Sequence, residues 1–439
     1  MRVKHLVRFL GFNILVFTVS CSPAKKIVSL PVPPSDTMLV VAPVVETKED
    51  QFFVDLFGKN LLAFDSVLKY RRERNVQIIY TQVDRSSNGT PQLKHFYFNR
   101  PNASYFYPAS TVKLPVALLA LEKVNQLNIP GLTKHSTMIT EAAFSGQTAV
   151  YNDPNTADGK PTIAQYIKKI LLVSDNDAYN RLYEFLGQEY TNTTLHKKGY
   201  TDAQILHRLD IFLSEEENRH TNPVKFFDSS NRLVRSFPEQ VSRLQYAKRD
   251  DSQGSGYYSG GVLQNRPMDF SKKNRLSLGD LHQVLISLIL PTAVKASQRF
   301  NLTDDDRRLV LQYMSQFPRE SHFPYYDSSY HDAYAKFVLY GSEKGKLPGN
   351  IRIFNKVGDA YGQLTDVAYV VDVQNKIEFF VSATIYCNSD GILNDDQYDY
   401  ETVGLPFMKH LGKLLYDHEK ARKKTFPADL SPLIFSYDK

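Results

Sequence analysis

Residues 110–121 read STVKLPVALLAL, and this stretch guides the interpretation of the rest of the chain. From Ser110 to Asn128 apolar residues recur at helical spacing, which predicts a helix that begins near Ser110. Because residues three apart share a helix face, the Ser110 hydroxyl and the Lys113 amine would lie side by side. The alternative is an exposed helix start with Ser110 as the N-cap and Lys113 in solvent, since serine favours that position.

Two further short motifs follow along the chain. Ser174-Asp175-Asn176 falls between predicted helices at Thr162–Val173 and Asp177–Leu186, where a tight loop would direct short polar side chains sideways. The same residue types also serve as ordinary helix N-caps. Lys356-Val357-Gly358 ends a β-rich segment, where the glycine would let a substrate lie against the strand, although a plain strand end with a solvated lysine is the alternative. Together the three motifs are harder to attribute to chance than any one alone.

These residue types suit acyl transfer by a serine. A serine hydroxyl becomes a good nucleophile only when a base takes its proton, and Lys113 can act as that base if burial or nearby cations lower its pKa. Lys356 would supply the second cation and attract an anionic substrate. Ser174 would relay a proton between Lys113 and the leaving nitrogen, and Asn176 would hold the substrate amide.

The same motifs also supply donors for a developing oxyanion. A helix N-terminus at Ser110 favours negative charge there, because its backbone N–H groups point outward. We expect the backbone N–H groups of Ser110 and Asp359 to form the oxyanion hole, with Gly358 allowing the close approach of the substrate.

The order of predicted elements indicates a discontinuous sheet. A helix (Asp50–Arg72) and two strands precede a long, mostly helical block that extends to about residue 340, and three strands and a helix (Glu401–Lys424) follow it. The predicted strands are Val76–Tyr80, His95–Phe98, Ile351–Lys356, Val367–Val371 and Ile377–Ile385, and the later helices are Leu278–Leu290 and Thr303–Gln316. The fold class is therefore α/β of the α+β type: an antiparallel sheet flanked by terminal helices, with an inserted all-helical lobe.

We divide the chain accordingly. One hydrolase domain spans 49–439, with its sheet part at 49–100 and 350–424 and its helical lobe at 105–340. Residues 228–273 are rich in glycine, serine and tyrosine, which predicts a long surface insertion or lid within the lobe. Whether it gates a substrate or forms a partner surface stays open.

The first 20 residues have the layout of an export signal. Arg2, Lys4 and Arg8 precede an apolar run that is too short to span a bilayer, and Cys21 follows at once. A small residue before a cysteine resembles a bacterial lipobox, so we expect lipidation of Cys21, a proline-rich tether over 21–48 and a periplasmic or cell-envelope location. An ordinary secretory signal is the alternative.

Composition limits the other function classes. The chain has 53 Lys and Arg against 47 Asp and Glu, and loss of the signal leaves 50 basic residues, for a net charge of +3. No basic tract with interleaved aromatics stands out, so a nucleic-acid partner is poorly supported. The 11 histidines show no metal-ligand spacing and no phosphate-binding glycine loop is apparent, so no metal or cofactor is expected.

On the three motifs, the chain resembles the class A β-lactamases from about Asp50 to Lys420. Further matches are Thr162-Ile163-Ala164, Thr365-Asp366-Val367-Ala368, and Arg208-Leu209-Asp210 with Thr221-Asn222-Pro223, which resemble the two ends of the family's omega loop. The resemblance implies a β-lactamase/transpeptidase-like fold and a serine hydrolase that forms an acyl-enzyme on Ser110 with a β-lactam or related amide. A D-Ala-D-Ala peptidase-like hydrolase, or a non-catalytic, lipid-anchored cell-wall binding protein, is the alternative.

Two departures from the family pattern bear on turnover. No E-x-x-L-N pattern follows Asp210, and Leu213 falls near the place of the glutamate that activates water in the family. The acids at 215–217 are nearby, but such a run is more typical of a solvated surface. Val357 replaces the usual threonine or serine, which removes a hydrogen bond to the substrate carboxylate worth roughly 1.5 to 3 kcal/mol.

Overall fold

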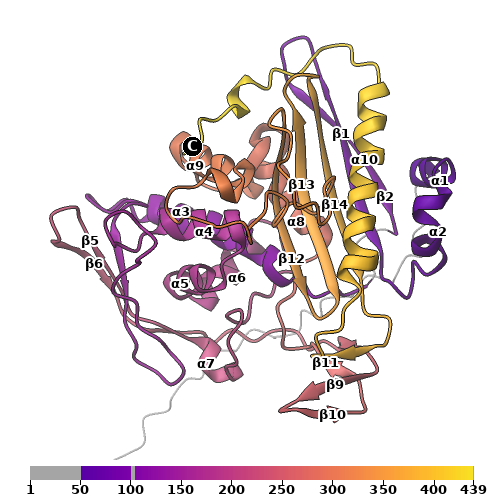
Figure 1. The fold of residues 1–439 in the computed structure, drawn as a ribbon. Coiled ribbons are helices and arrows are strands. Elements are labelled where there is room, and N and C mark those ends of the chain that lie inside the picture. The colour runs from indigo at the N-terminus through magenta and orange to yellow at the C-terminus, as the bar shows by residue number, and fades with distance from the viewer. Residues whose placement is uncertain (1–50, 100–103, 439) are drawn as a thin grey trace, which may run out of the picture. The chain divides into compact units, whose positions relative to one another are not determined.

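A computed structural model describes residues 51–99 and 104–438 (Figure 1). The predicted export signal (1–20), the predicted lipidation site Cys21 and the predicted tether (21–48) lie outside the described residues. Among the described helices, none is both long and apolar enough to cross a membrane.

A five-stranded antiparallel sheet forms the centre of the described chain, in the order β12-β13-β14-β1-β2. Its strands are β1 (Gln77–Arg85), β2 (Pro91–Phe98), β12 (Ile351–Ala360), β13 (Gln363–Asp372) and β14 (Ile377–Tyr386). β12, β13 and β14 pair in sequence, so the predicted C-terminal meander is confirmed. The N-terminal hairpin joins it where β1 pairs with β14, so both ends of the chain build one sheet.

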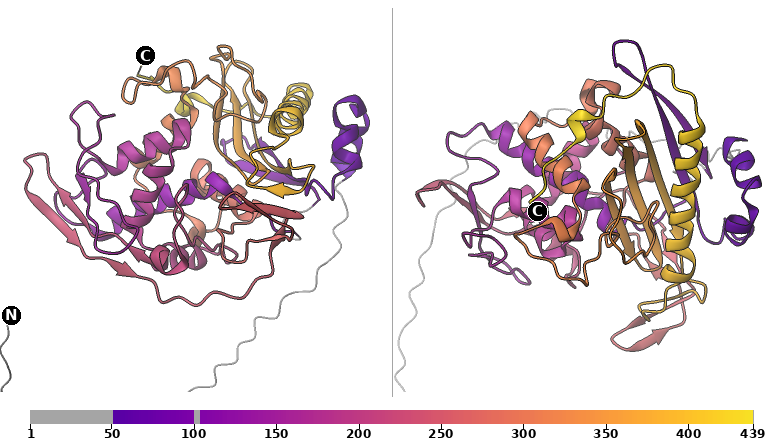
Figure 2. Two further views of the ribbon diagram at one scale, coloured as in Figure 1. Left: turned by 60° about the horizontal axis from the view of Figure 1, so that its bottom comes forward. Right: turned by 45° about the horizontal axis from the view of Figure 1, so that its top comes forward.

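Both faces of the sheet are buried at β13 and β14, where nearly every residue is buried. Successive side chains alternate between the two faces, so Phe380 of β14 packs with the inserted lobe while Phe379 packs with the terminal helices. α8 (Leu278–Ile289) covers the first face and α10 (Leu405–Ala421) covers the second (Figure 2). Each face therefore has its own hydrophobic core.

The terminal helices α1 (Gln51–Gly58), α2 (Leu61–Lys69) and α10 form the layer on one side of the sheet (Figure 1). The single helix predicted for Asp50–Arg72 is wrong, because the chain breaks between α1 and α2. Gly58 and Asn60 are both poor helix formers, and the Asn60 amide instead donates to the carbonyl of Leu56 at 3.1 Å.

The C-terminal helix begins later than its pattern predicted. A π-helical turn at Tyr400–Gly404 precedes α10, which ends at Ala421. Within this turn, a Cβ on Gly404 would meet the Cys387 sulfur and a Leu364 methyl group at 2.7 Å each. The close packing of Gly404 on the end of the sheet therefore leaves no room for a side chain at this turn. Cys387 is buried and its thiol is free.

The inserted lobe lies on the other side of the sheet and is mainly helical, as predicted. Its helices besides α8 are η1 (Ala109–Val112), α3 (Lys113–Leu127), α4 (Ile163–Val173), α5 (Asn176–Leu186), α6 (Gln188–Lys197), α7 (Glu215–Arg219), η2 (Pro291–Ala293), η3 (Ala296–Gln298), α9 (Asp304–Ser315) and η4 (Pro318–Glu320). The lobe is not wholly helical, however: β3 (Thr137–Thr140), β5 (Val224–Phe227) and β6 (Leu233–Phe237) form a small sheet, and β4 (His220–Thr221) pairs with β7 (Gln240–Val241). Alternating burial in β3 and β5 explains these strands.

The predicted insertion at 228–273 contains short strands. β8 (Ser252–Gln253) pairs with β11 (Met268–Asp269), and β9 (Gly256–Ser259) forms a hairpin with β10 (Val262–Gln264). Gly260 and Gly261 make its turn with φ of 57° and 78°, values that favour glycine. β15 (Ile392–Leu393) runs parallel to β9 and connects the insertion to the chain that follows the sheet.

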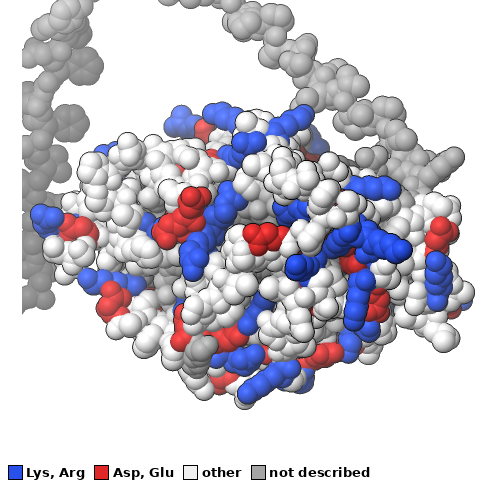
Figure 3. All heavy atoms as spheres, turned by 90° about the horizontal axis from the view of Figure 1, so that it is seen from above, with Lys and Arg blue, Asp and Glu red and all other residues white. Residues whose placement is uncertain are grey.

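The charged surface is mixed in sign on the face that Figure 3 shows. Lys and Arg side chains lie among Asp and Glu side chains there and form no continuous basic stripe. That distribution agrees with the nearly balanced composition of 53 basic and 47 acidic residues.

Candidate active site

Ser110 lies where the lobe meets the edge of the sheet. It sits in η1, directly before α3, and it is partly exposed. The preceding residue, Ala109, has φ of 45°, a left-handed conformation that is unusual for a residue with a side chain and that clusters at functional sites. A Cβ on Gly358 would approach the backbone nitrogen of Ser110 to 2.9 Å, so β12 lies directly against the serine.

Lys113 is fully buried, and its amine donates to the second motif. Its Nζ contacts the Ser174 carbonyl oxygen, the Ser174 Oγ at 3.2 Å and the Asn176 Oδ1 at 2.6 Å. The Ser110 hydroxyl makes no hydrogen bond with any described residue, so the expected direct pairing of Ser110 with Lys113 is not formed. These contacts occupy the three donors of an ammonium group.

The second motif is a tight loop between two helices, as predicted. Ser174 ends α4 with φ of 61°, and Asp175 is the N-cap of α5, where its carboxylate accepts from the Ala178 N–H at 2.8 Å. Asn176 is the first residue of α5. The capping alternative therefore holds for Asp175 alone, while Ser174 and Asn176 turn toward Lys113.

Lys356 approaches the same loop from the sheet. Its Nζ donates to the Ser174 Oγ at 2.8 Å and to the Val357 carbonyl oxygen at 2.8 Å. Two lysines that are far apart in sequence thus share one hydroxyl, that of Ser174. A hydroxyl that accepts from both amines is positioned to pass a proton between them and a bound group.

Burial sets the charge state of this pair. It lowers the pKa of Lys113 to about 7, while the carboxylates of Asp175, Asp359 and Asp210 act in the opposite direction. Burial also lowers the pKa of Lys356 well below its ordinary value, and the charge of Lys113 adds to that decrease. Both amines are therefore easier to deprotonate than a lysine in water.

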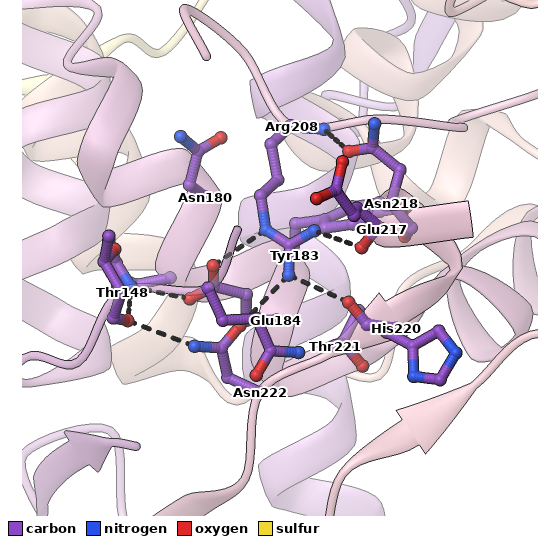
Figure 4. Close-up of polar contacts among 12 residues, drawn as sticks. Thr148, Asn180, Tyr183, Glu184, Arg208, Glu217, Asn218, His220, Thr221 and Asn222 are labelled. Carbon is purple, nitrogen blue, oxygen red and sulfur yellow. Dashed lines mark hydrogen bonds and ion pairs between the residues drawn. The ribbon is translucent and has the colours of Figure 1, made fainter. Parts of the chain in front are cut away.

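The buried side chain of Arg208 closes the 208–222 loop (Figure 4). The Arg208 guanidinium donates to Glu184 Oε1 of α5 at 2.8 Å, to Asn222 Oδ1 at 3.0 Å and to the carbonyl oxygens of Glu217 and His220 at 3.2 and 3.0 Å. Both ends of the loop are thus fixed to α5.

Comparison with known proteins identifies the family of this chain. A model of the β-lactamase enzyme family matches residues 64–418, most of the chain. The chain belongs to this β-lactamase family. No curated protein sequence matches it.

Solved β-lactamases are similar to this family member at low identity. The β-lactamase of Desulfarculus baarsii is 15% identical, over 82% of this chain and 97% of its own, with a TM-score of 0.44. That of Xanthomonas campestris pv. campestris is 14% identical over 81% and 97% (TM-score 0.43), and the class A enzyme of Clostridium kluyveri is 13% identical over 82% and 98% (TM-score 0.44).

Asp210, which the sequence analysis named only as part of the match at 208–210, lies near the second motif. The Asn180 side chain bonds both backbone groups of Leu209, accepting from its N–H at 2.8 Å and donating to its carbonyl at 3.0 Å. Asp210 follows with φ of 56° and accepts from the Asn176 Nδ2 at 3.3 Å. Leu213, which the sequence placed near the family's glutamate, lies beside Gly146 instead. The sequence signal was the position of Asp210, two residues after Arg208.

The three acids at 215–217 each contact a partner near the surface. Glu215 pairs with Lys272 at 2.7 Å, Glu216 with His220 at 3.1 Å, and Glu217 forms a capping box with Ser214 at the start of α7. These contacts match the solvated surface expected from the run of charges.

The end of β12 holds the remaining predicted residues. Val357 is 3% exposed and packs in the core on the far face of the sheet, so this strand offers no hydroxyl at that position. Asp359 pairs with Leu364 across the hairpin, and its side chain is exposed. Burial nonetheless raises the pKa of the Asp359 carboxyl, while the charges of Lys356 and Lys113 act in the opposite direction.

The described part of this family member contains no group of three or more His, Cys, Asp or Glu side chains arranged to hold a metal ion. A cavity of about 570 Å³ lies between the 208–222 loop and the insertion and is lined by Ile211, Phe212, Lys248 and Lys273 among others.

Proposed function

We propose that this protein is a serine acyl-transfer hydrolase that forms an acyl-enzyme on Ser110 with a β-lactam or a related amide. The observation that carries the proposal is the meeting of Lys113 and Lys356 at the Ser174 hydroxyl, beside the strand that contacts Ser110. Family membership supports the reaction class.

Acylation uses the low pKa of the buried amine. In its neutral form Lys113 accepts the Ser110 proton as the Ser110 Oγ bonds to the substrate carbonyl carbon. The carbonyl oxygen becomes an oxyanion held by the N–H groups of Ser110 and Asp359. When the C–N bond breaks, the leaving nitrogen takes the hydroxyl proton of Ser174, which an amine of Lys113 or Lys356 replaces.

Deacylation requires an activated water. We assign its activation to Asp210, because its carboxylate is held near Asn176 and Lys113 at the mouth of the site. An aspartate is one methylene shorter than the family's glutamate, so we expect the acyl-enzyme to form faster than it is hydrolysed.

Covalent labelling tests the proposal. We expect an uncharged fluorophosphonate and a fluorescent penicillin to label the purified protein, with peptide mass mapping placing each adduct on Ser110. Ser110→Ala should abolish labelling, whereas Ser66→Ala, on the exposed face of α2, should leave it intact. Equal labelling of the Ser110→Ala variant would contradict the assignment.

A chromogenic cephalosporin separates an enzyme from a binding protein. Steady hydrolysis that Lys113→Ala abolishes would support turnover. A rate that is the same with and without Lys113 would favour the non-catalytic, cell-wall binding alternative, for which the lost hydroxyl at Val357 is the specific observation.

We further propose that the protein is exported and lipid-anchored through Cys21. The support is the order of basic residues, apolar run and cysteine at 1–21. Metabolic labelling with a radioactive fatty acid should mark the wild type and leave Cys21→Ser unmarked. Labelling of both would contradict the anchor, and secretion without any label would favour an ordinary signal.

A further inference from the structure

Beside the contact between β12 and Ser110, the end of this strand places a carboxylate that has no hydrogen-bond or ion-pair partner in the described part of the chain. The Asp359 side chain is exposed and makes no hydrogen bond or ion pair with the residues described. It follows Gly358. A Cβ placed on Gly358 would lie 2.9 Å from the Ser110 backbone nitrogen. The free carboxylate is therefore one residue away from the point where the strand touches the serine.

The groups around Asp359 offer little to bind a substrate carboxylate. Val357 has no hydroxyl and is buried in the far core. The Lys356 amine already donates to the Ser174 hydroxyl and the Val357 carbonyl, both at 2.8 Å. Across the hairpin from Val357, Asp366 is a buried acid that accepts from the Phe337 and Val338 N–H groups.

A second carboxylate lies near the buried amine of Lys113. Asp210 is exposed, and its contact with Asn176 is a hydrogen bond from an uncharged amide, at 3.3 Å. The fields of Asp359 and Asp210 both reach Lys113, where they oppose the decrease in its pKa. The charges of Lys356 and Lys113 compensate the Asp359 carboxylate only in part, since they lower its pKa less than burial raises it. A negatively charged group entering here meets two carboxylates, whereas a positively charged group adds to the partial compensation.

On this basis, and resting on the proposed function, we infer that the site prefers acyl substrates that carry an ammonium group over substrates that carry a carboxylate, and that Asp359 determines this preference. Burial raises the pKa of the Asp359 carboxyl although the charges of Lys356 and Lys113 lower it, so these two lysines do not fully offset the loss of water around the carboxylate. An ammonium group would supply further positive charge in the complex.

A charge series of substrates tests the inference. We would use nitrophenyl esters with one acyl chain that ends in a trimethylammonium, a tert-butyl or a carboxylate group, so that shape changes little while charge runs from positive to negative. The measured quantity is kcat/KM at pH 8, which reports acylation and is independent of deacylation. We expect the cationic ester to exceed the anionic ester by about tenfold or more in the wild type.

Two variants assign the effect. Asp359→Asn keeps the shape and removes the charge, so it should reduce the cationic-to-anionic ratio to within about twofold. Asp65→Asn, on the exposed surface of α2, is the matched control and should keep the wild-type ratio. Thermal melts check that each variant folds.

Several outcomes would overturn the inference. An unchanged ratio in Asp359→Asn would do so. So would a wild-type preference for the anionic ester that is lost in Lys273→Ala, because Lys273, whose amine lies 5.6 Å from the Tyr361 ring centre, would then be the carboxylate-binding group. Failure of the uncharged fluorophosphonate and of every ester to modify Ser110 would contradict the proposed function itself, and this inference with it.

Discussion

At the scale of single residues, the site depends on the state of one amine. Lys113 donates three hydrogen bonds in this structure, and all of them go to Ser174 and Asn176. It can accept the Ser110 proton only after it loses its own. With its pKa lowered to about 7, an appreciable fraction of the protein has this amine neutral at physiological pH.

The pH dependence of acylation should follow this amine. Below pH 7 Lys113 is protonated and cannot act as a base, so the acylation rate constant should rise with pH and level off above about 7. Lys113→Arg stays protonated and should lower the rate constant roughly 10²- to 10⁴-fold. Stopped-flow acylation by a chromogenic ester measures both effects, with the exposed Lys420→Arg as control. A flat profile in the wild type would exclude Lys113 as the base.

Asp210 should affect mainly the second half of the reaction, because its loss acts on acylation only through a lower Lys113 pKa. Asp210→Asn keeps a group that can contact Asn176 but removes the base, so acylation should change little while the acyl-enzyme lifetime rises, by roughly 10²-fold or more. Intact-protein mass spectrometry after a pulse of substrate measures that lifetime. Glu216→Gln on the same loop is the control. An equally short lifetime in Asp210→Asn would show that another group activates the water.

At the scale of elements, a buried polar chain connects α8 to the sheet. Thr81 of β1 contacts His282 of α8 and His95 of β2, both at 2.7 Å, and His282 contacts Ser382 of β14 at 2.7 Å. Burial lowers the pKa of His282 to about 3, from an ordinary value of 6.5. The folded protein therefore requires this imidazole to be neutral.

Stability should consequently fall in acid. The lowered pKa of His282 leaves the stability of the folded protein undiminished above pH 6.5. As the pH falls from 6.5 toward 3, the unfolded state binds the proton and the folded state does not, so the free energy of unfolding decreases. From pH 7 to pH 4 His282 alone should reduce the free energy of unfolding by about 3 kcal/mol. Urea denaturation at both pH values should show a smaller difference in His282→Gln than in the wild type. The exposed His322→Gln should behave as the wild type, and equal pH dependence in all three proteins would contradict this role.

The elements also show what the sequence could and could not predict. The three C-terminal strands and the helices at α4, α5, α8 and α9 follow local periodicity, and the structure has them within a few residues of their predicted bounds. The break between α1 and α2 was missed although its signal is local, since Gly58 and Asn60 both disfavour helix. The strands β3 and β5 are too short for their pattern to identify them.

At the scale of the whole molecule, the site exists because distant segments meet. The Ser110 and Lys113 spacing is local and could be predicted, but the arrival of Lys356 at Ser174 depends on how the sheet docks on the lobe. The placement of Asp210 depends on contacts from Asn180 and on a left-handed backbone, which a linear pattern does not encode. The sequence therefore predicted which residues form the candidate site better than it predicted the hydrogen bonds between them.

The docking itself can be tested at Gly358. A Cβ there would lie 2.7 Å from the Pro108 carbonyl oxygen and 2.9 Å from the nitrogens of Ser110 and Thr111, which are backbone atoms that cannot turn aside. Gly358→Ala should thus move β12 away from η1, with a loss of stability of about 1 to 3 kcal/mol and at least a tenfold slower acylation of Ser110.

Gly345→Ala is the matched control, because a Cβ there meets nothing within 4 Å. Chemical denaturation and fluorophosphonate labelling rates, measured on both variants, separate the two parts of the effect. Wild-type labelling by a destabilised Gly358→Ala protein would mean that the strand can shift without disturbing the serine. Slower labelling at unchanged stability would instead mean that the substitution disturbs only the contact between β12 and η1. That contact places the edge of the sheet beside the Ser110 nucleophile.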